Sequence, residues 1–110
     1  MLSRNKRTEV QGTFDANGDL TVSVSVPLGP SWELRQVAIK TTSVLESACS
    51  TYVGTNDSGV FVSQSFTGNA DTDSEPNVTL RPGDSFCAVW SVGTTGALGT
   101  LTLIYDEVAY

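Results

Sequence analysis

Few residues in this 110-residue chain are able to do chemistry. The sequence has no histidine, which removes Ser-His and Cys-His nucleophile pairs, imidazole zinc sites and the most common general base. Cys49 and Cys87 lie in separate strand-like runs, and neither context offers a cation or a helix N-terminus that would stabilise a thiolate. We expect both to be small buried thiols, with a disulfide between them as the alternative.

Carboxylates supply the remaining chemical possibilities. Asp71, Asp73 and Glu75 lie in the polar segment 67–76, which we expect to be the longest exposed loop. Two carboxylates facing across a cleft could serve a glycosidase, but nothing in this polar segment suggests the raised pKa that its acid needs. Oxygen ligands this close in sequence could instead hold calcium. We expect a solvated acidic loop and no metal.

A second acidic group has the spacing of the first three ligands of a calcium loop, namely Asp15, Asn17 and Asp19. The later glycine and glutamate of such a loop are missing at the required offsets, and a β-turn explains these residues. The glycines of the segment 93–99 join two strands, so they do not form a phosphate-binding loop. We therefore expect no catalytic or cofactor-binding residues and no enzymatic activity.

The charge of the chain is unevenly distributed. Six Lys and Arg against twelve Asp and Glu give a net charge of −6, which argues against a nucleic-acid partner. Three of the six cations, Arg4, Lys6 and Arg7, fall within the first seven residues. We expect residues 1–7 to be a basic arm that docks on a neighbouring subunit, with a solvated basic end as the alternative.

Two further features concern the surface and the environment of the protein. Only 16% of the residues are charged, which is lean for a soluble monomer and suggests that part of the surface is covered by a partner. We find neither the apolar segment of a secretory signal nor a run of 18 apolar residues. We expect a protein that is made and used without crossing a membrane, and no membrane partner.

The hydrophobic pattern predicts strands throughout. Residues 20–26 alternate strictly between apolar and hydroxyl side chains, and Asn17-Gly18 before them predicts a type I′ hairpin turn. In residues 31–41 the apolar positions switch from even to odd near Arg35-Gln36, which predicts a β-bulge there. About eight such runs, separated by turn signals, predict a single antiparallel β-sandwich, jelly-roll-like, over residues 8–105, with a C-terminal tail over 106–110.

The aromatic residues divide into two groups. Trp32, Phe86 and Trp90 alternate with apolar neighbours and are expected in the core. Tyr52, Tyr105 and Tyr110 are expected at an interface, because a ring with a polar tip suits a partly wet contact. Arg4, Lys6 and Arg7 are expected at the same kind of surface.

Several short motifs, in a fixed order, resemble a known group of proteins. They are Gly29-Pro30-Ser31-Trp32, Cys49 with Tyr52 and Gly54, Thr67-Gly68-Asn69 with Asp71, Glu75-Pro76-Asn77, Leu80-Arg81-Pro82-Gly83-Asp84 and Ala88-Val89-Trp90. Over roughly Thr8 to Ile104 this order resembles small β-sandwich virion structural proteins of tailed bacteriophages, especially phages of actinobacteria.

The resemblance implies a non-enzymatic virion component that is assembled in the cytoplasm of the bacterial host. It implies a capsid decoration or minor capsid protein that binds the major capsid protein or other virion subunits, as a homo-oligomer and most often a trimer. The alternative is a tail-tip or fibre-associated module that recognises a glycan on the host surface with exposed aromatic rings and the segment 67–76.

Overall fold

The computed structural model describes residues 2–45, 47–67 and 70–109, and in these ranges it contains only β-strands, with no helix to cross a membrane. The predicted all-β class is confirmed, with nine strands rather than about eight. In chain order the strands are β1 (Leu2–Thr13), β2 (Leu20–Ser25), β3 (Ser31–Thr41), β4 (Ala48–Val53), β5 (Val60–Thr67), β6 (Ala70–Asp73), β7 (Thr79–Leu80), β8 (Ser85–Ser91) and β9 (Leu98–Val108).

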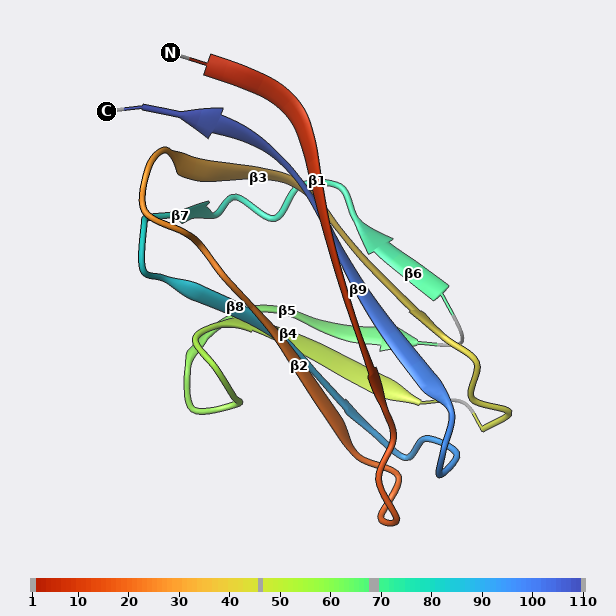
Figure 1. Ribbon diagram of the computed structural model, residues 1–110. Coiled ribbons are helices and arrows are strands. Elements are labelled where there is room, and N and C mark those ends of the chain that lie inside the picture. Colours follow the sequence, from red (N-terminus) through yellow and green to blue (C-terminus); the bar gives the residue numbers. More distant parts are fainter. Residues whose placement is uncertain (1, 46, 68–69, 110) are drawn as a thin grey trace.

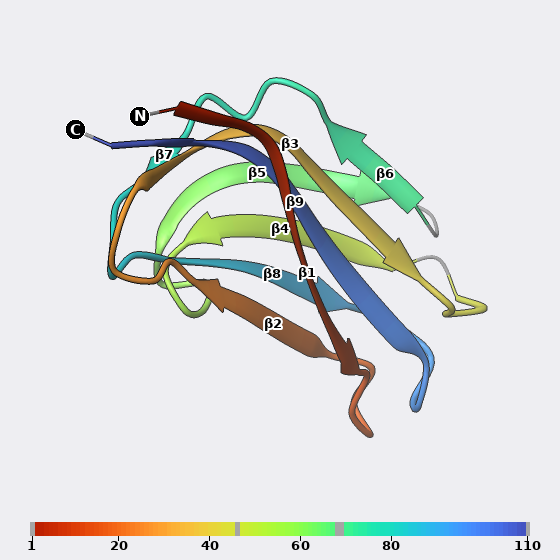
Figure 2. The ribbon, with the colours of Figure 1, turned by 45° about the horizontal axis from the view of Figure 1, so that its top comes forward.

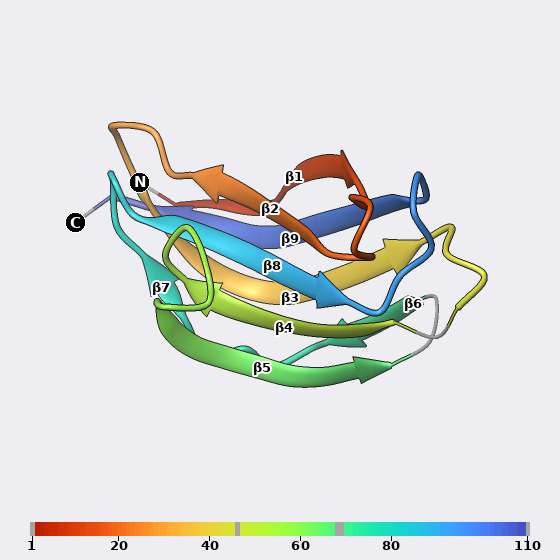
Figure 3. The same ribbon diagram turned by 90° about the horizontal axis from the view of Figure 1, so that it is seen from below.

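The strands form two antiparallel sheets that pack face to face (Figures 1 and 3). Sheet A has the order β1-β9-β3-β6, with β7 also paired to β3, and sheet B has the order β2-β8-β4-β5. The pairs are nested: β1 pairs with β9, β2 with β8, β3 with β6 and β7, and β4 with β5. A nested antiparallel ladder rolled into two sheets is a jelly roll, so the predicted sandwich topology is confirmed.

The core lies between the two sheets and follows the alternation of the strands. From sheet A, the central strand β9 directs Leu101, Leu103 and Tyr105 inward, and each is 5% exposed or less. From sheet B, the central strand β8 directs Phe86, Ala88 and Trp90 inward, all 1% exposed or less. Trp32 is also buried, so the expected core aromatics are confirmed.

The predicted bulge in β3 is present. The register of β3 against β9 shifts between Leu34 and Gln36, which leaves Arg35 as the extra residue. Leu34 before the bulge and Val37 after it are both buried, because the inserted residue returns the apolar positions to the inner face.

The turn expected at Asn17-Gly18 exists, but its type and its neighbours differ from the prediction. Gly18 alone has a positive φ, of 77°, and its N–H donates to the carbonyl of Asp15 at 3.1 Å, so the turn is not type I′. The flanking strands β1 and β2 also belong to different sheets (Figure 2). The turn is a corner between the sheets and not a hairpin, because each strand pairs with a distant partner.

The ends of the chain contradict the expected strand boundaries. β1 begins at Leu2 and not at Thr8, and β9 continues to Val108, with Leu2 paired to Val108. The segment expected as a basic arm is therefore largely strand, and so is the start of the expected tail. The sequence of residues 2–7 did not predict this pairing, because these residues are mostly polar. An edge strand such as β1 can be polar, since one of its sides faces solvent.

The acidic segment 67–76 is also more regular than expected. Residues 70–73 form edge strand β6 on β3, with Asp71 opposite Ile39 and Asp73 opposite Val37. Charged residues are common on edge strands because they discourage pairing with other chains. Gly68 and Asn69 of this segment lie outside the described residues.

We predict that Leu103→Ala lowers the free energy of unfolding by about 2–5 kcal/mol, because Leu103 is fully buried in the central strand of sheet A. Leu28→Ala is the matched control, since Leu28 is 93% exposed, and it should change stability by about 0.5 kcal/mol or less. Urea unfolding of the two variants measures both values. Equal losses would contradict the assignment of the core.

Candidate functional site

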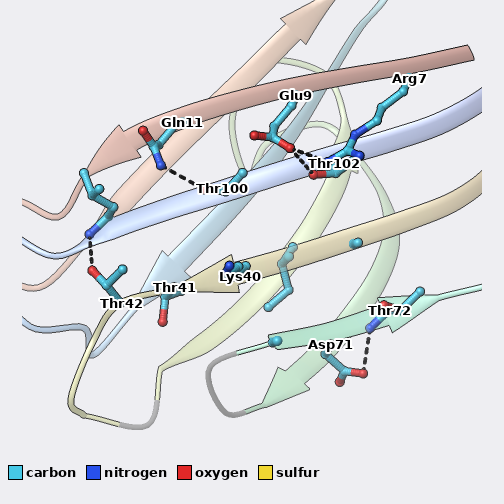
Figure 4. Close-up of a pocket in the computed structure, with 14 residues that line it drawn as sticks. Arg7, Glu9, Gln11, Lys40, Thr41, Thr42, Asp71, Thr72, Thr100 and Thr102 are labelled. Atoms are coloured by element: carbon cyan, nitrogen blue, oxygen red, sulfur yellow. Dashed lines mark hydrogen bonds and ion pairs between the residues drawn. The ribbon is translucent and has the colours of Figure 1, made fainter.

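The outer face of sheet A carries a shallow polar depression of about 450 Å³ that crosses the sheet from β1 to β6 (Figure 4). All four strands contribute to it. Its lining residues are Arg7, Glu9 and Gln11 of β1, Leu98, Thr100 and Thr102 of β9, Ala38, Ile39, Lys40 and Thr41 of β3 with Thr42 after it, and Ala70, Asp71 and Thr72 of β6.

Strand alternation explains why these side chains gather there. Val10 and Leu101 face inward as a pair, so Glu9 and Thr102 face outward as the next pair. Thr102 is in turn opposite Ala38 in β3, and Ala38 is opposite Thr72 in β6. The result is a row of side chains that runs across all four strands on the outer face.

A parallel row lies one step along the strands. It consists of Gln11, Thr100, Lys40 and Ala70 in consecutive register. The small Ala38 and Ala70 leave the space that forms the depression beside Lys40, and Figure 4 shows the long side chains around it.

One side of the depression holds a network of hydrogen bonds. Arg7 Nη2 donates to Glu9 Oε2 at 2.8 Å, and the Thr102 hydroxyl donates to the same oxygen at 3.2 Å. These two contacts, the Arg7 bond foremost, lower the pKa of Glu9 below its ordinary value. Glu9 is thus anionic at neutral pH, and the Gln11 amide donates to Thr100 Oγ1 at 3.2 Å beside it.

The other side of the depression carries charged groups that form no ion pair with a described residue. Lys40 is exposed, and no described residue forms an ion pair with it. Asp71 Oδ1 accepts only the N–H of Thr72, at 2.8 Å, among the described residues. The surface therefore offers a cation, a carboxylate and several hydroxyl groups to a polar partner.

The structure brings together some of the predicted interface residues and separates others. Arg7 and Asp71, expected in an arm and in a loop, line the same depression from opposite edges of sheet A. Arg4 and Lys6 are exposed nearer the start of β1. Glu75 is exposed beyond the end of β6, and its N–H donates to Asp73 Oδ1 at 3.0 Å.

Tyr105 was expected at an interface, and this expectation is wrong. Its ring stacks on Trp32 with centroids 4.0 Å apart and an interplanar angle of 13°, and its hydroxyl lies 2.8 Å from Thr8 Oγ1. The alternation of β9 places it on the inner face with Leu103. Tyr110 lies outside the described residues.

Sequence reasoning missed the most constrained ionic group, Asp106. Its side chain is 3% exposed, and its Oδ2 accepts from Arg35 Nε at 2.7 Å and pairs with Arg35 Nη2 at 2.6 Å. Its Oδ1 accepts the backbone N–H of Asn5 at 3.0 Å, where β1 also bulges and φ is 54°. The Asn5 bond and then Arg35 hold the pKa of Asp106 below its ordinary value. The outward alternation of Ile104 and Asp106, read together with the predicted bulge at Arg35, was the signal that could have revealed it.

The two cysteines are free and buried, as expected. Cys49 faces the core, whereas Cys87 points to the outer side of sheet B, where its thiol donates to the carbonyl of Asn56 at 3.6 Å. Burial raises the pKa of Cys49 to about 12 and also raises that of Cys87. Both are therefore thiols at neutral pH and not activated nucleophiles.

The carboxylates that suggested calcium have other roles or stand apart. Asp15 Oδ1 accepts the N–H groups of Asn17 and Asp19 at 2.8 and 3.0 Å, which stabilises the turn. Within residues 2–45, 47–67 and 70–109, no group of three or more Cys, Asp or Glu side chains is arranged to hold a metal ion.

Comparisons with known proteins do not assign a family. No family model matches the chain, and no curated protein matches it. Among solved structures, the Drosophila NLP core, described for pentamer formation and histone binding, is 10% identical and has a TM-score of 0.44 over 91% of this chain and 96% of that chain. The structure of infectious bursal disease virus Gx strain is 12% identical, with a TM-score of 0.27 over 98% of this chain and 35% of that chain. Likenesses at this level do not bear on function.

We predict that acid weakens the fold through Asp106. The folded protein lowers the pKa of this carboxyl, so its stabilisation is complete above about pH 5 and is lost as the pH falls through 3.8 and below. Asp106→Asn should lower the thermal midpoint at pH 7 and flatten its decline between about pH 5 and about pH 3. Asp19→Asn, in the exposed β1–β2 turn, is the control. A constant difference between wild type and Asp106→Asn at every pH would contradict the ionic role.

We also predict that neither thiol reacts with a thiol-specific reagent in the native protein near pH 8, because both are at most 2% exposed and their pKa values are raised. Both should react once the protein is unfolded in denaturant. Rapid labelling of either thiol in the native state would contradict this prediction. It would show that the β4–β5 loop opens over Cys87 or that the core opens at Cys49.

Proposed function

We propose that this chain is a non-enzymatic structural subunit of a tailed bacteriophage particle, and specifically a capsid decoration or minor capsid protein that binds and stabilises the head shell. The observation that carries the proposal is the division of charge between the sheets. Every charged residue that lies in a strand belongs to sheet A, and the strands of sheet B contain none. The order of motifs in the sequence supplies the phage context.

A sandwich with one charged and one uncharged sheet suits a protein whose function is to bind other subunits. The charged outer face of sheet A presents Arg7 and Lys40 beside Glu9, with Asp71 at the β6 edge, a mixed pattern that can match an opposite pattern on another protein. Such complementarity selects one partner over others and fixes its orientation. We place the contact with the major capsid protein on this face.

Rigidity is the second property that a clamp on a shell requires. One end of sheet A, where the first and last strands meet, is tied by the paired Leu2 and Val108 and by the bonds of Asp106 to Arg35 and Asn5. A surface that is already ordered pays less conformational entropy on binding. Attachment then stabilises the shell by bridging subunits and not by folding onto them.

The same depression favours a second candidate function, a tail-tip or fibre module that binds a glycan. The hydroxyl groups of Thr72, Thr100 and Thr102 and the amide of Gln11 are groups that pair with sugar hydroxyls. However, none of the described residues that line the depression is aromatic. A glycan array and the copy number per particle separate the two functions, since a decoration protein is abundant and a tail-tip module is scarce.

We predict that the double variant Arg7→Glu/Lys40→Glu weakens binding to undecorated phage heads by roughly tenfold or more, because both cations would meet partner carboxylates as like charges. Wild-type binding should also weaken with added salt. Arg81→Glu reverses an exposed cation outside the depression and is the matched control. Unchanged occupancy of heads by the double variant, measured by sedimentation and electron microscopy, would refute this docking face.

A further inference from the structure

The outer face of sheet B is unusual for an exposed sheet because its strand residues have hydroxyl and apolar side chains but no charge. The nearby carboxylate of Asp57 belongs to the β4–β5 loop. In register across β2, β8 and β4, one row is Thr21, Val89 and Ser50, and the next is Ser23, Cys87 and Tyr52. At the β5 side, the ring of Phe61 is half exposed and packs edge-on against Tyr52 at 5.9 Å. Figure 3 shows this sheet running across the molecule.

The edge strands of sheet B also lack charged residues, although the pairing of β5 with β4 is interrupted by two register shifts. β2 and β5 are its edge strands, and neither contains a lysine, another charged residue or a proline. Exposed edges of monomeric proteins commonly carry such residues to prevent pairing with other chains. Edge strand β6 of sheet A does carry them, in Asp71 and Asp73. The contrast within one domain indicates that sheet B is covered.

We propose that a second copy of this chain covers the outer face of sheet B. A contact between two copies related by a two-fold axis uses the same patch on both, so the patch must be complementary to itself. A hydroxyl group is both a donor and an acceptor, so the rows of Ser and Thr can pair with their own copies. This inference does not depend on attachment to a phage head.

The charge of the protein favours this occupant. Two copies of a chain with a net charge of −6 repel each other, and the repulsion is smallest when their charged surfaces are far apart. Packing sheet B on sheet B puts the charged outer faces of the two A sheets about 30 Å apart, since stacked sheets lie about 10 Å apart. That separation exceeds the Debye length of about 8 Å at physiological salt.

The size of the face is near the lower limit of specific interfaces. Four strands about 4.8 Å apart and about six residues long cover roughly 400 Å² in projection. The accessible area is larger because the side chains give the face relief, and it approaches the roughly 600 Å² per partner of the smaller specific interfaces. The β4–β5 loop forms a ledge at one end, where it covers Cys87 and carries Asp57, so a two-fold arrangement sets the two ledges at opposite ends.

The test is the mass of the purified protein in solution, by analytical ultracentrifugation and light scattering from micromolar to millimolar concentration. We expect wild type to be oligomeric and Thr21→Glu, at an exposed position of edge strand β2, to raise its dissociation constant roughly tenfold or more. Thr13→Glu makes the same change at an exposed position of edge strand β1 in sheet A and should leave the mass unchanged.

Each result decides the proposal. A dimer that Thr21→Glu dissociates supports the two-fold contact through sheet B, whereas a trimer built through this face would overturn it. A wild-type monomer at all concentrations, or an oligomer that Thr21→Glu and Thr13→Glu affect equally, overturns it. Hydrogen exchange on the wild-type protein gives a test that does not depend on the folding of a variant. If sheet B is the contact, backbone amides of β2, β8 and β4 should exchange more slowly as the protein concentration rises, and those of β1 should not.

Discussion

The arrangement of sheet A depends on one carboxylate. Asp106 lies in the central strand β9 and bonds to both neighbours at the points where they bulge, to Arg35 in β3 and to the backbone of Asn5 in β1. A bulge leaves an unpaired residue, and a buried N–H without an acceptor is costly. Asp106 accepts the backbone N–H of Asn5 at the bulge in β1 and pairs with the side chain of Arg35, the extra residue of the bulge in β3. The bulge in β3 keeps Trp32 and Ile39 on the same inner face.

The consequence extends to the core and to the outer surface. With Leu34 and Val37 both inward, β3 contributes apolar side chains along its whole length. The residues left on the outer face, among them Lys40 and Ala38, then fall in register with Thr100 and Thr102 and form the depression. The polar surface of sheet A is thus a product of the same register that completes the core.

The sequence was sufficient for features that depend on local alternation. The strand from Leu20 to Ser25, the bulge at Arg35 and the inward faces of β8 and β9 follow from which neighbours are apolar, since each has one side in the core. Features that depend on remote pairing could not be predicted in this way. The strand character of residues 2–7 and 70–73 comes from pairing with β9 and β3, and at the edge of a sheet their side chains need not alternate. Tyr105 was misjudged because a tyrosine fits both a core and an interface, and its stacking partner Trp32 is distant in the sequence.

The nesting of the strands also shapes how the chain acquires its structure. Among the described strands β1 pairs only with β9, so β1 cannot take its place in a sheet until β9 has been made. Local hairpins such as β4 with β5 can form earlier, but neither sheet is complete until β8 and β9 are made. Pairing across such long loops is slow and leaves strand edges exposed in the meantime. This domain therefore closes only after β9 has been synthesised.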